Sequence, residues 1–195
     1  MTYKIEYYYP IRVYNSVVDN YQSINYQIDK VIDKVDFKMV DRWAPTHYIS
    51  TDFEGNGEVD ILKDLRLHKV KKIIDNHLRV YCSELNFPVR DYELKTWFSL
   101  FKKGNYAHIH DHGQADISGV YYYKTTEKKG LCDGDIFFQP PFPYRECFNI
   151  DSHDINHTPQ LGEILLFPGW FKHGVRTSTS DHDRISLSFN IQFKI

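Results

Sequence analysis

The chain of 195 residues lacks long apolar runs, paired cysteines and an excess of charge of either sign. With no run of about 18 apolar residues and no apolar core near its first residue, we expect neither a membrane span nor a signal peptide. Its three cysteines, Cys82, Cys132 and Cys147, show no C-x-x-C spacing, which argues against a disulfide scaffold or a thiolate zinc site. The net charge of -2 offers no basic field for nucleic acid. We therefore predict a soluble cytoplasmic protein without a membrane or nucleic-acid partner.

Aromatic residues, in contrast, are abundant: they make up 16% of the chain, with 15 Tyr and 13 Phe. Such side chains pack well on pleated surfaces, so this composition favours β-structure. The length suits one domain. We predict a single domain over residues 1–195, with a strand and supporting helices in 1–90 and the core in 91–195.

Within the first ninety residues, apolar side chains recur at helical spacing twice. They predict a surface helix over residues 18–35 and a longer helix over 58–85. Residues 3–14 indicate a strand, and residues 39–56 a loop with one short strand near Tyr48.

From residue 91 onward the pattern changes to short strands separated by turn residues. We predict strands over 92–102, 106–112, 117–124, 135–139, 146–150, 154–158, 163–168, 172–176 and 184–193. Two helices followed by such a series indicate a mainly β protein with N-terminal helices, built as an antiparallel double-sheet jelly roll.

Three histidines stand at alternate positions of the strand predicted over 106–112: His108, His110 and His112. Side chains alternate between the faces of a strand, so all three imidazoles point the same way. Neutral imidazole is the commonest protein metal ligand. The strand therefore predicts a metal site, the alternative being a polar loop in which histidines cluster by chance.

The last strand alternates polar and apolar side chains, with one polar face formed by Arg184, Ser186, Ser188 and Asn190. One face of each strand in a closed barrel looks inward. Burying an unpaired guanidinium is costly, whereas its planar fork matches a carboxylate. The pattern predicts a polar, anionic occupant inside the barrel, unless Arg184 points outward from an exposed strand.

Four ordered blocks resemble the 2-oxoglutarate/Fe(II)-dependent dioxygenases, and most closely an uncharacterised subgroup of putative 2OG-Fe(II) oxygenases. The resemblance extends from Trp97 to Asn190. The blocks are His110-Asp-His112, Ser118-Gly-Val-Tyr-Tyr122, Leu166-Phe-Pro-Gly-Trp-Phe-Lys-His-Gly-Val175 and Arg184-Ile-Ser-Leu-Ser-Phe-Asn190.

The resemblance implies a double-stranded β-helix, similar to the cupins, that holds one Fe(II) and uses 2-oxoglutarate and O2 as co-substrates. In the family, two histidines and a carboxylate bind one face of the metal. His110 and His173 match the two histidine positions, and His112 matches the carboxylate position. Arg184 matches the anchor of the distal carboxylate of 2-oxoglutarate, with Ser186 alongside.

Three further residues are expected around the co-substrate. Asn190 shares the inward face of Arg184. Tyr121 and Tyr123 share a face of their strand, so one of them hydrogen-bonds 2-oxoglutarate or lines the cavity; packing in the core is the alternative for both.

The sequence departs from the family where H-x-D/E has become H-x-H, which raises the charge of the iron site by one unit. We predict that His110, His112 and His173 bind the metal. In a second arrangement the carboxylate comes from Asp116, and in a third the site includes His108. Asp111 is disfavoured because it lies on the opposite face from His110.

The resemblance implies an Fe(II)- and 2-oxoglutarate-dependent dioxygenase that hydroxylates an unidentified substrate with release of succinate and CO2. Two other functions compete with it: a three-histidine iron dioxygenase that does not use 2-oxoglutarate, and a non-catalytic jelly-roll binding or structural protein. Because the subgroup is frequent in marine bacteria and their phages, the resemblance also suggests a phage-encoded protein expressed in a bacterial host.

Overall fold

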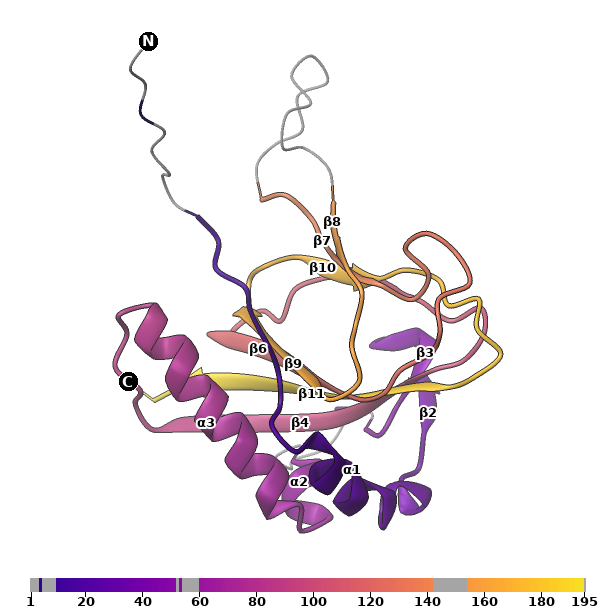
Figure 1. Ribbon diagram of the computed structural model, residues 1–195, viewed down its shortest axis with the longest axis horizontal. Helices are drawn as coiled ribbons and strands as arrows, with labels where there is room; N and C mark the ends of the chain where they lie inside the picture. Colours follow the sequence, from indigo (N-terminus) through magenta and orange to yellow (C-terminus); the bar gives the residue numbers. More distant parts are fainter. Residues whose placement is uncertain (1–3, 5–9, 52, 54–59, 142–153, 195) are drawn as a thin grey trace.

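Two antiparallel β-sheets face each other in the computed structural model, and the helices cover the outer face of the larger sheet (Figure 1). The structure describes residues 4, 10–51, 53, 60–141 and 154–194. No helix in these ranges is long and apolar enough to cross a membrane.

The first part of the chain forms β1 (Tyr14–Val17), α1 (Tyr21–Asp29), the 3-10 helix η1 (Ile32–Lys34), β2 (Lys38–Val40), β3 (Ala44–Ile49), α2 (Ile61–Asp64) and α3 (His68–Glu84). The second part forms β4 (Tyr92–Phe101), β5 (Ala107–His110), β6 (Ile117–Lys124), β7 (Ile136–Phe138), β8 (Ile155–His157), β9 (Glu163–Pro168), β10 (His173–Val175) and β11 (Arg184–Phe193).

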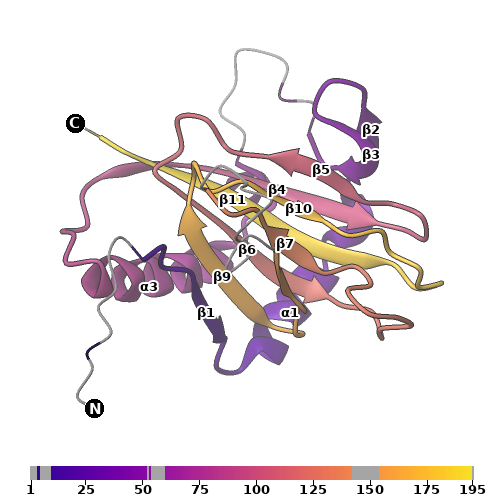
Figure 2. The ribbon, with the colours of Figure 1, turned by 90° about the horizontal axis from the view of Figure 1, so that it is seen from above.

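The larger sheet has seven strands in the order β1-β9-β6-β11-β4-β3-β2, and the smaller sheet has four in the order β5-β10-β7-β8. The smaller sheet lies over the larger one when the molecule is seen from above (Figure 2). This arrangement confirms the predicted mainly β, double-sheet fold.

Strand β11 lies at the centre of the larger sheet, paired along its length with β4 and along most of it with β6. Its side chains alternate between two environments, as the sequence predicts. Ile185, Leu187 and Phe189 pack with the helices in the largest apolar cluster. The side chains on the opposite face of β11, which include Arg184 and Asn190, lie in the space between the two sheets.

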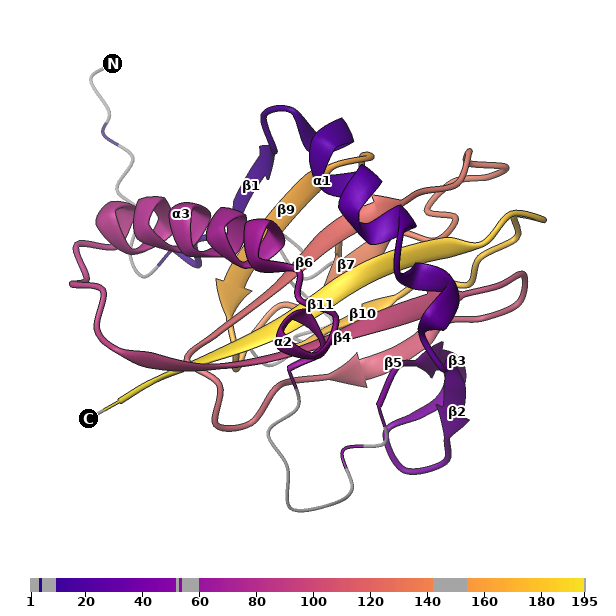
Figure 3. The ribbon, with the colours of Figure 1, turned by 90° about the horizontal axis from the view of Figure 1, so that it is seen from below.

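The helices bury their apolar stripes against the outer face of the larger sheet (Figure 3). In α3, Val70, Ile74, Leu78 and Tyr81 are buried, at the spacing of one helical face. The helix predicted over 58–85 is interrupted between α2 and α3, where Arg66 takes a left-handed conformation with φ 56 that ends a helix.

The helix predicted over 18–35 is also shorter than expected. Regular α-helix ends at Asp29, and a single 3-10 turn, η1, follows.

The strand bounds predicted for β6, β9 and β11 are confirmed to the residue, and those of β4, β5, β7, β8 and β10 lie within the predicted ranges. The strand predicted over 146–150 lies outside the described residues, as does half of the one predicted over 3–14. Residues 10–13 of the latter are described but are not in a strand, and β1 begins only at Tyr14.

The first ninety residues also contribute β1, β2 and β3 to the larger sheet. The short strand expected near Tyr48 is present as β3, whereas β2 was not expected. Strand β1 pairs with β9, and β3 pairs with β4 while β2 extends the sheet edge. The pairings of β1 with β9 and of β3 with β4 join segments distant in sequence, which local patterns do not reveal.

Gly119 lies in β6 where the neighbouring strands leave no room for a side chain. A Cβ atom there would be 2.3 Å from Phe189 Cζ and 2.7 Å from the Leu165 carbonyl oxygen. We expect Gly119→Ala to lower the free energy of unfolding by about 1–3 kcal/mol, as overpacked cores do, measured by denaturant titration. The control is Gly130→Ala, whose Cβ would have no described atom within 4 Å. Equal stability of the two variants would contradict this account of the sheet.

Candidate metal centre

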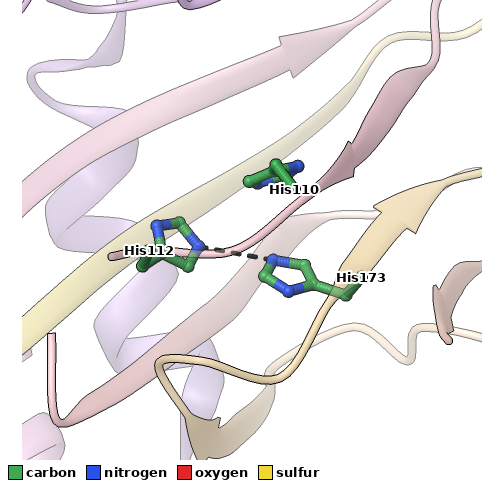
Figure 4. A group of neighbouring side chains, drawn as sticks. All are labelled: His110, His112 and His173. Carbon is green, nitrogen blue, oxygen red and sulfur yellow. Dashed lines mark hydrogen bonds between the residues drawn. The ribbon is translucent and has the colours of Figure 1, made fainter. Parts of the chain in front are cut away.

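Three imidazoles converge where β5 ends and the neighbouring strand β10 begins. His110 ends β5, His112 follows two residues later, and His173 begins β10 directly opposite His110 in the strand pairing. The three rings point toward one another (Figure 4). Their candidate ligand atoms all lie within 4.8 Å of one another, and His112 Nε2 lies 3.3 Å from His173 Nε2. This geometry suits one metal ion bound through three Nε2 atoms.

Backbone carbonyl groups fix the orientation of two of these rings. The Nδ1–H of His110 donates to the carbonyl oxygen of His108 over 2.7 Å, and that of His173 donates to the carbonyl oxygen of Phe171 over 2.8 Å. Because a carbonyl oxygen only accepts, the proton of each neutral ring lies on Nδ1. The Nε2 lone pair is then free for a metal, as in most histidine-ligated sites.

The third ring, His112, has a side-chain partner instead. Its Nδ1 lies 3.2 Å from the amide nitrogen of Asn190, and the Ser118 hydroxyl donates to the Asn190 oxygen over 2.9 Å. Asn190 was expected near the co-substrate, and the structure places it against a candidate metal ligand.

Apolar side chains surround the buried part of the cluster. The rings of Phe167 and Phe138 lie 4.7 Å and 6.0 Å from that of His173. Burial, with the nearby His110, lowers the pKa of His112 to about 3, and burial lowers the pKa of His173 well below its ordinary value. Both imidazoles are therefore neutral at physiological pH, the form that binds metals.

The other candidate ligands point elsewhere. Asp116 accepts a hydrogen bond from the Phe193 amide over 2.8 Å, and Asp111 accepts one from the Gly113 amide over 3.1 Å. His108 packs edge-to-face on Tyr106. Within the described part of the chain, His110, His112 and His173 form the one group of metal-binding side chains close enough to share an ion.

Arg184 lies buried between the sheets, as expected for a co-substrate anchor. Its guanidinium stacks on the rings of Phe101 and Tyr122 and donates one hydrogen bond to the Gly134 carbonyl oxygen over 2.6 Å. Neither Arg184 Nε nor the buried Tyr122 hydroxyl has a hydrogen-bond partner among the described residues. Two unsatisfied donors beside a buried positive charge fit a carboxylate ligand.

The residues expected around the co-substrate are only partly brought together. Ser186 is buried on the inward face, opposite Tyr122 in the strand pairing. Tyr121 and Tyr123, in contrast, point to the helix side of the sheet, where their hydroxyls donate to Asn25 and Asp29. These two tyrosines belong to the core, and the structure corrects their expected position: Tyr122, in the opposite phase of the strand, faces the interior instead.

His47 is a residue of the interior that the sequence pattern did not identify. It lies in β3, and its ring stacks on Phe101 with 4.5 Å between centroids. Its buried Nδ1 has no partner among the residues that the structure describes. Nothing in the local sequence distinguishes it, because its place follows from the pairing of β3 with β4.

Burial, together with the charges of His110 and Arg184, lowers the pKa of His47 from the ordinary 6.5 to about 4. In the unfolded chain His47 thus binds a proton near pH 6.5, whereas in the folded chain it stays neutral. The free energy of unfolding therefore falls as the pH drops through this value. Between pH 7 and 5 we expect the wild type to lose about 1–2 kcal/mol more of its free energy of unfolding than His47→Phe does.

This difference is measured by denaturant titration with a chelator present. Between pH 8 and 7, above the ordinary pKa of histidine, the wild type and His47→Phe should change almost equally in their free energy of unfolding, which serves as the control. A His47→Phe protein with the full acid sensitivity would contradict the assigned burial.

Residues 95–190 match the family model described as "Putative 2OG-Fe(II) oxygenase". No curated protein matches the chain. Among solved structures, a Pseudomonas putida prolyl-4-hydroxylase is similar at 13% identity with a TM-score of 0.65, covering 95% of this chain and 94% of that chain. HygX from Streptomyces hygroscopicus, solved with nickel and 2-oxoglutarate bound, is similar at 12% identity with a TM-score of 0.64, covering 94% and 82%. A Trichoplax adhaerens prolyl hydroxylase in complex with a hypoxia inducible factor peptide fragment has 13% identity and a TM-score of 0.64, covering 93% and 83%.

The fold is that of a double-stranded β-helix protein, and its three imidazoles form a candidate site for one metal ion. The match assigns residues 95–190 of the chain to the 2OG-Fe(II) oxygenases, a family that depends on Fe(II) and 2-oxoglutarate. The expected family and fold are thereby confirmed.

Loss of any one ring of the cluster should abolish tight metal binding. We expect His110→Ala, His112→Ala and His173→Ala each to weaken Zn(II) or Fe(II) binding by more than the roughly 10–100-fold that loss of an outer partner costs, measured by anaerobic calorimetric titration. His108→Ala, on the same strand, is the control and should bind as the wild type does. Loss of metal from His108→Ala but not from His112→Ala would contradict the assignment.

Proposed function

We propose that His110, His112 and His173 hold the Fe(II), that Arg184 anchors 2-oxoglutarate, and that the enzyme hydroxylates its substrate. The observation that carries this proposal is the presence, in one interior, of three converging imidazoles and a buried arginine with an unpartnered Nε. The imidazoles alone would suit many metalloproteins, and the arginine alone would suit many anions. Together they match the two ends of 2-oxoglutarate, a metal-chelating 2-oxo acid and a distal carboxylate.

When bound, Fe(II) and 2-oxoglutarate supply the oxidative chemistry, which yields succinate, CO2 and a hydroxylated product. The protein positions these groups and keeps water away. Three ligands on one face leave the opposite positions of a metal open to small molecules. The apolar walls formed by Phe138, Phe167 and Val120 limit solvent access on the buried side.

Around the distal carboxylate we place a set of donors from three strands. The guanidinium of Arg184 supplies the charge, and the hydroxyls of Tyr122 and Ser186 supply hydrogen bonds from adjacent positions of β6 and β11. His47, on β3, adds a ring nitrogen on the side of Phe101. All four side chains are anchored on strands, which hold donors more precisely than loops do.

The histidine in place of the family carboxylate changes the electrostatics of the proposed site. Three neutral imidazoles leave the full double charge of Fe(II) uncompensated by protein ligands. An anionic co-substrate is then attracted more strongly than at a site with a carboxylate ligand, because unit charges interact strongly in a partly buried environment.

The proposal is tested by adding Fe(II) and then 2-oxoglutarate to the protein without oxygen, and by following the visible charge-transfer band of the chelate. Arg184→Leu should still bind Fe(II) but need at least about 30-fold more 2-oxoglutarate for the band, equivalent to about 2 kcal/mol for a lost buried charge pair.

Arg176→Leu is the matched control, since Arg176 pairs with Asp154 and Asn156 away from the metal centre. Iron binding without a band would overturn the 2-oxoglutarate assignment in favour of a three-histidine dioxygenase. A protein that binds no iron would be a non-catalytic jelly roll.

The similar structures include one in complex with a peptide fragment and one with hygromycin B bound. The fold therefore accommodates both peptides and small molecules, and the residues at the entrance to the site of this chain determine which substrate it accepts.

We place the enzyme in the cytoplasm, phage-encoded and expressed in a bacterial host, and we expect no nucleic-acid partner.

A further inference from the structure

The third imidazole differs from the other two in what fixes its proton. His110 and His173 each donate Nδ1–H to a backbone carbonyl oxygen, which can only accept. The Nδ1 of His112 faces the side-chain amide of Asn190, which can donate through its nitrogen or accept through its oxygen. The tautomer of His112 therefore depends on whether the nitrogen or the oxygen of the Asn190 amide faces its Nδ1.

One arrangement of the hydrogen bonds joins the two rings directly. The Ser118 hydroxyl donates to Asn190 Oδ1, and Asn190 Nδ2 donates to His112 Nδ1. His112 then carries its proton on Nε2, which lies 3.3 Å from His173 Nε2 and donates to it. In this arrangement His112 has no lone pair to offer a metal ion.

A half-turn of the Asn190 amide gives the second arrangement with the same heavy-atom positions. Asn190 Oδ1 then accepts Nδ1–H from His112, and Asn190 Nδ2 donates to the Ser118 hydroxyl oxygen. Asn190 stays hydrogen-bonded to both His112 and Ser118, whereas the hydrogen bond between His112 Nε2 and His173 Nε2 is lost. The lone pair of His112 Nε2 now faces His110 and His173.

We infer that Asn190, held in place by Ser118, is the positioning residue that stabilises the metal-binding tautomer of His112, because its amide oxygen can accept Nδ1–H when a metal ion takes the Nε2 lone pair. The inference rests on the proposed function. A carboxylate ligand has no tautomers, so a site with a third histidine needs a partner that sets the ring proton, in the way that carboxylates and carbonyls orient histidine ligands elsewhere. Asn190 occupies that place, on the strand that also carries Arg184.

Variants of Asn190 separate this role from a structural one. Asn190→Asp can only accept, so it should hold His112 with the proton on Nδ1 before any metal is added, and it should bind Zn(II) at least as tightly as the wild type. Asn190→Ala removes the acceptor for the His112 Nδ1–H, and Ser118→Ala removes the group that holds Asn190 in place. Both variants should bind Zn(II) about 10–100-fold more weakly than the wild type.

The matched controls are Asn25→Ala and Asn25→Asp. Both ends of the Asn25 amide are also hydrogen-bonded, to Tyr121 and Tyr123, but on the opposite face of the sheet. These variants should keep the wild-type Zn(II) affinity even where they lower the melting temperature.

The readouts are calorimetric Zn(II) titration and the ¹⁵N chemical shifts of the His112 ring, which report the protonated nitrogen directly. The inference is overturned if Asn190→Ala binds Zn(II) as tightly as the wild type, or if His112 in Asn190→Asp keeps its proton on Nε2. Either result, with an intact charge-transfer band in the wild type, would leave the proposed function standing. A wild type that binds no metal would overturn both.

Discussion

The pairing of β11 between β4 and β6 is the interaction on which both the core and the candidate site depend. Its side-chain alternation sends Leu187 and Phe189 to the helices and sends Arg184 and Asn190 to the interior. A slip of one residue would exchange these faces and place a guanidinium in the apolar core. The long register with β4 therefore places both the proposed co-substrate anchor, Arg184, and the hydrogen-bond partner of His112, Asn190, on the inward face.

The second constraint is the short pairing of β10 with β5, which sets His173 opposite His110. These strands belong to the smaller sheet, whereas Asn190 belongs to the larger one, so the candidate metal centre lies between the two sheets. A third imidazole in place of a carboxylate adds a requirement for proton placement that an acidic ligand would not have. The neighbouring amide of Asn190 meets this requirement with a side chain that already belongs to the central strand.

Much of the site could be predicted from the sequence, and the failures have clear physical causes. The alternation along residues 184–190 located Arg184 on the inward face because the other face is strictly apolar. The same argument did not work for β6, because both of its faces are buried and the sequence does not show which residues face the site. Tyr121 and Tyr123 were therefore expected at the site, whereas Tyr122 is the tyrosine that faces it.

Alternation along single strands was enough to predict the strand series, the inward phase of Arg184 and the shared face of His110 and His112. The resemblance also named His173, but its place opposite His110 follows from the pairing of strands distant in the sequence. The same holds for the contacts of Asp116 and His108 away from the cluster and for the positions of His47 and Tyr122. Such facts depend on which strands become neighbours. That choice is made by the burial of both sheets and the helices together, and no local pattern records it.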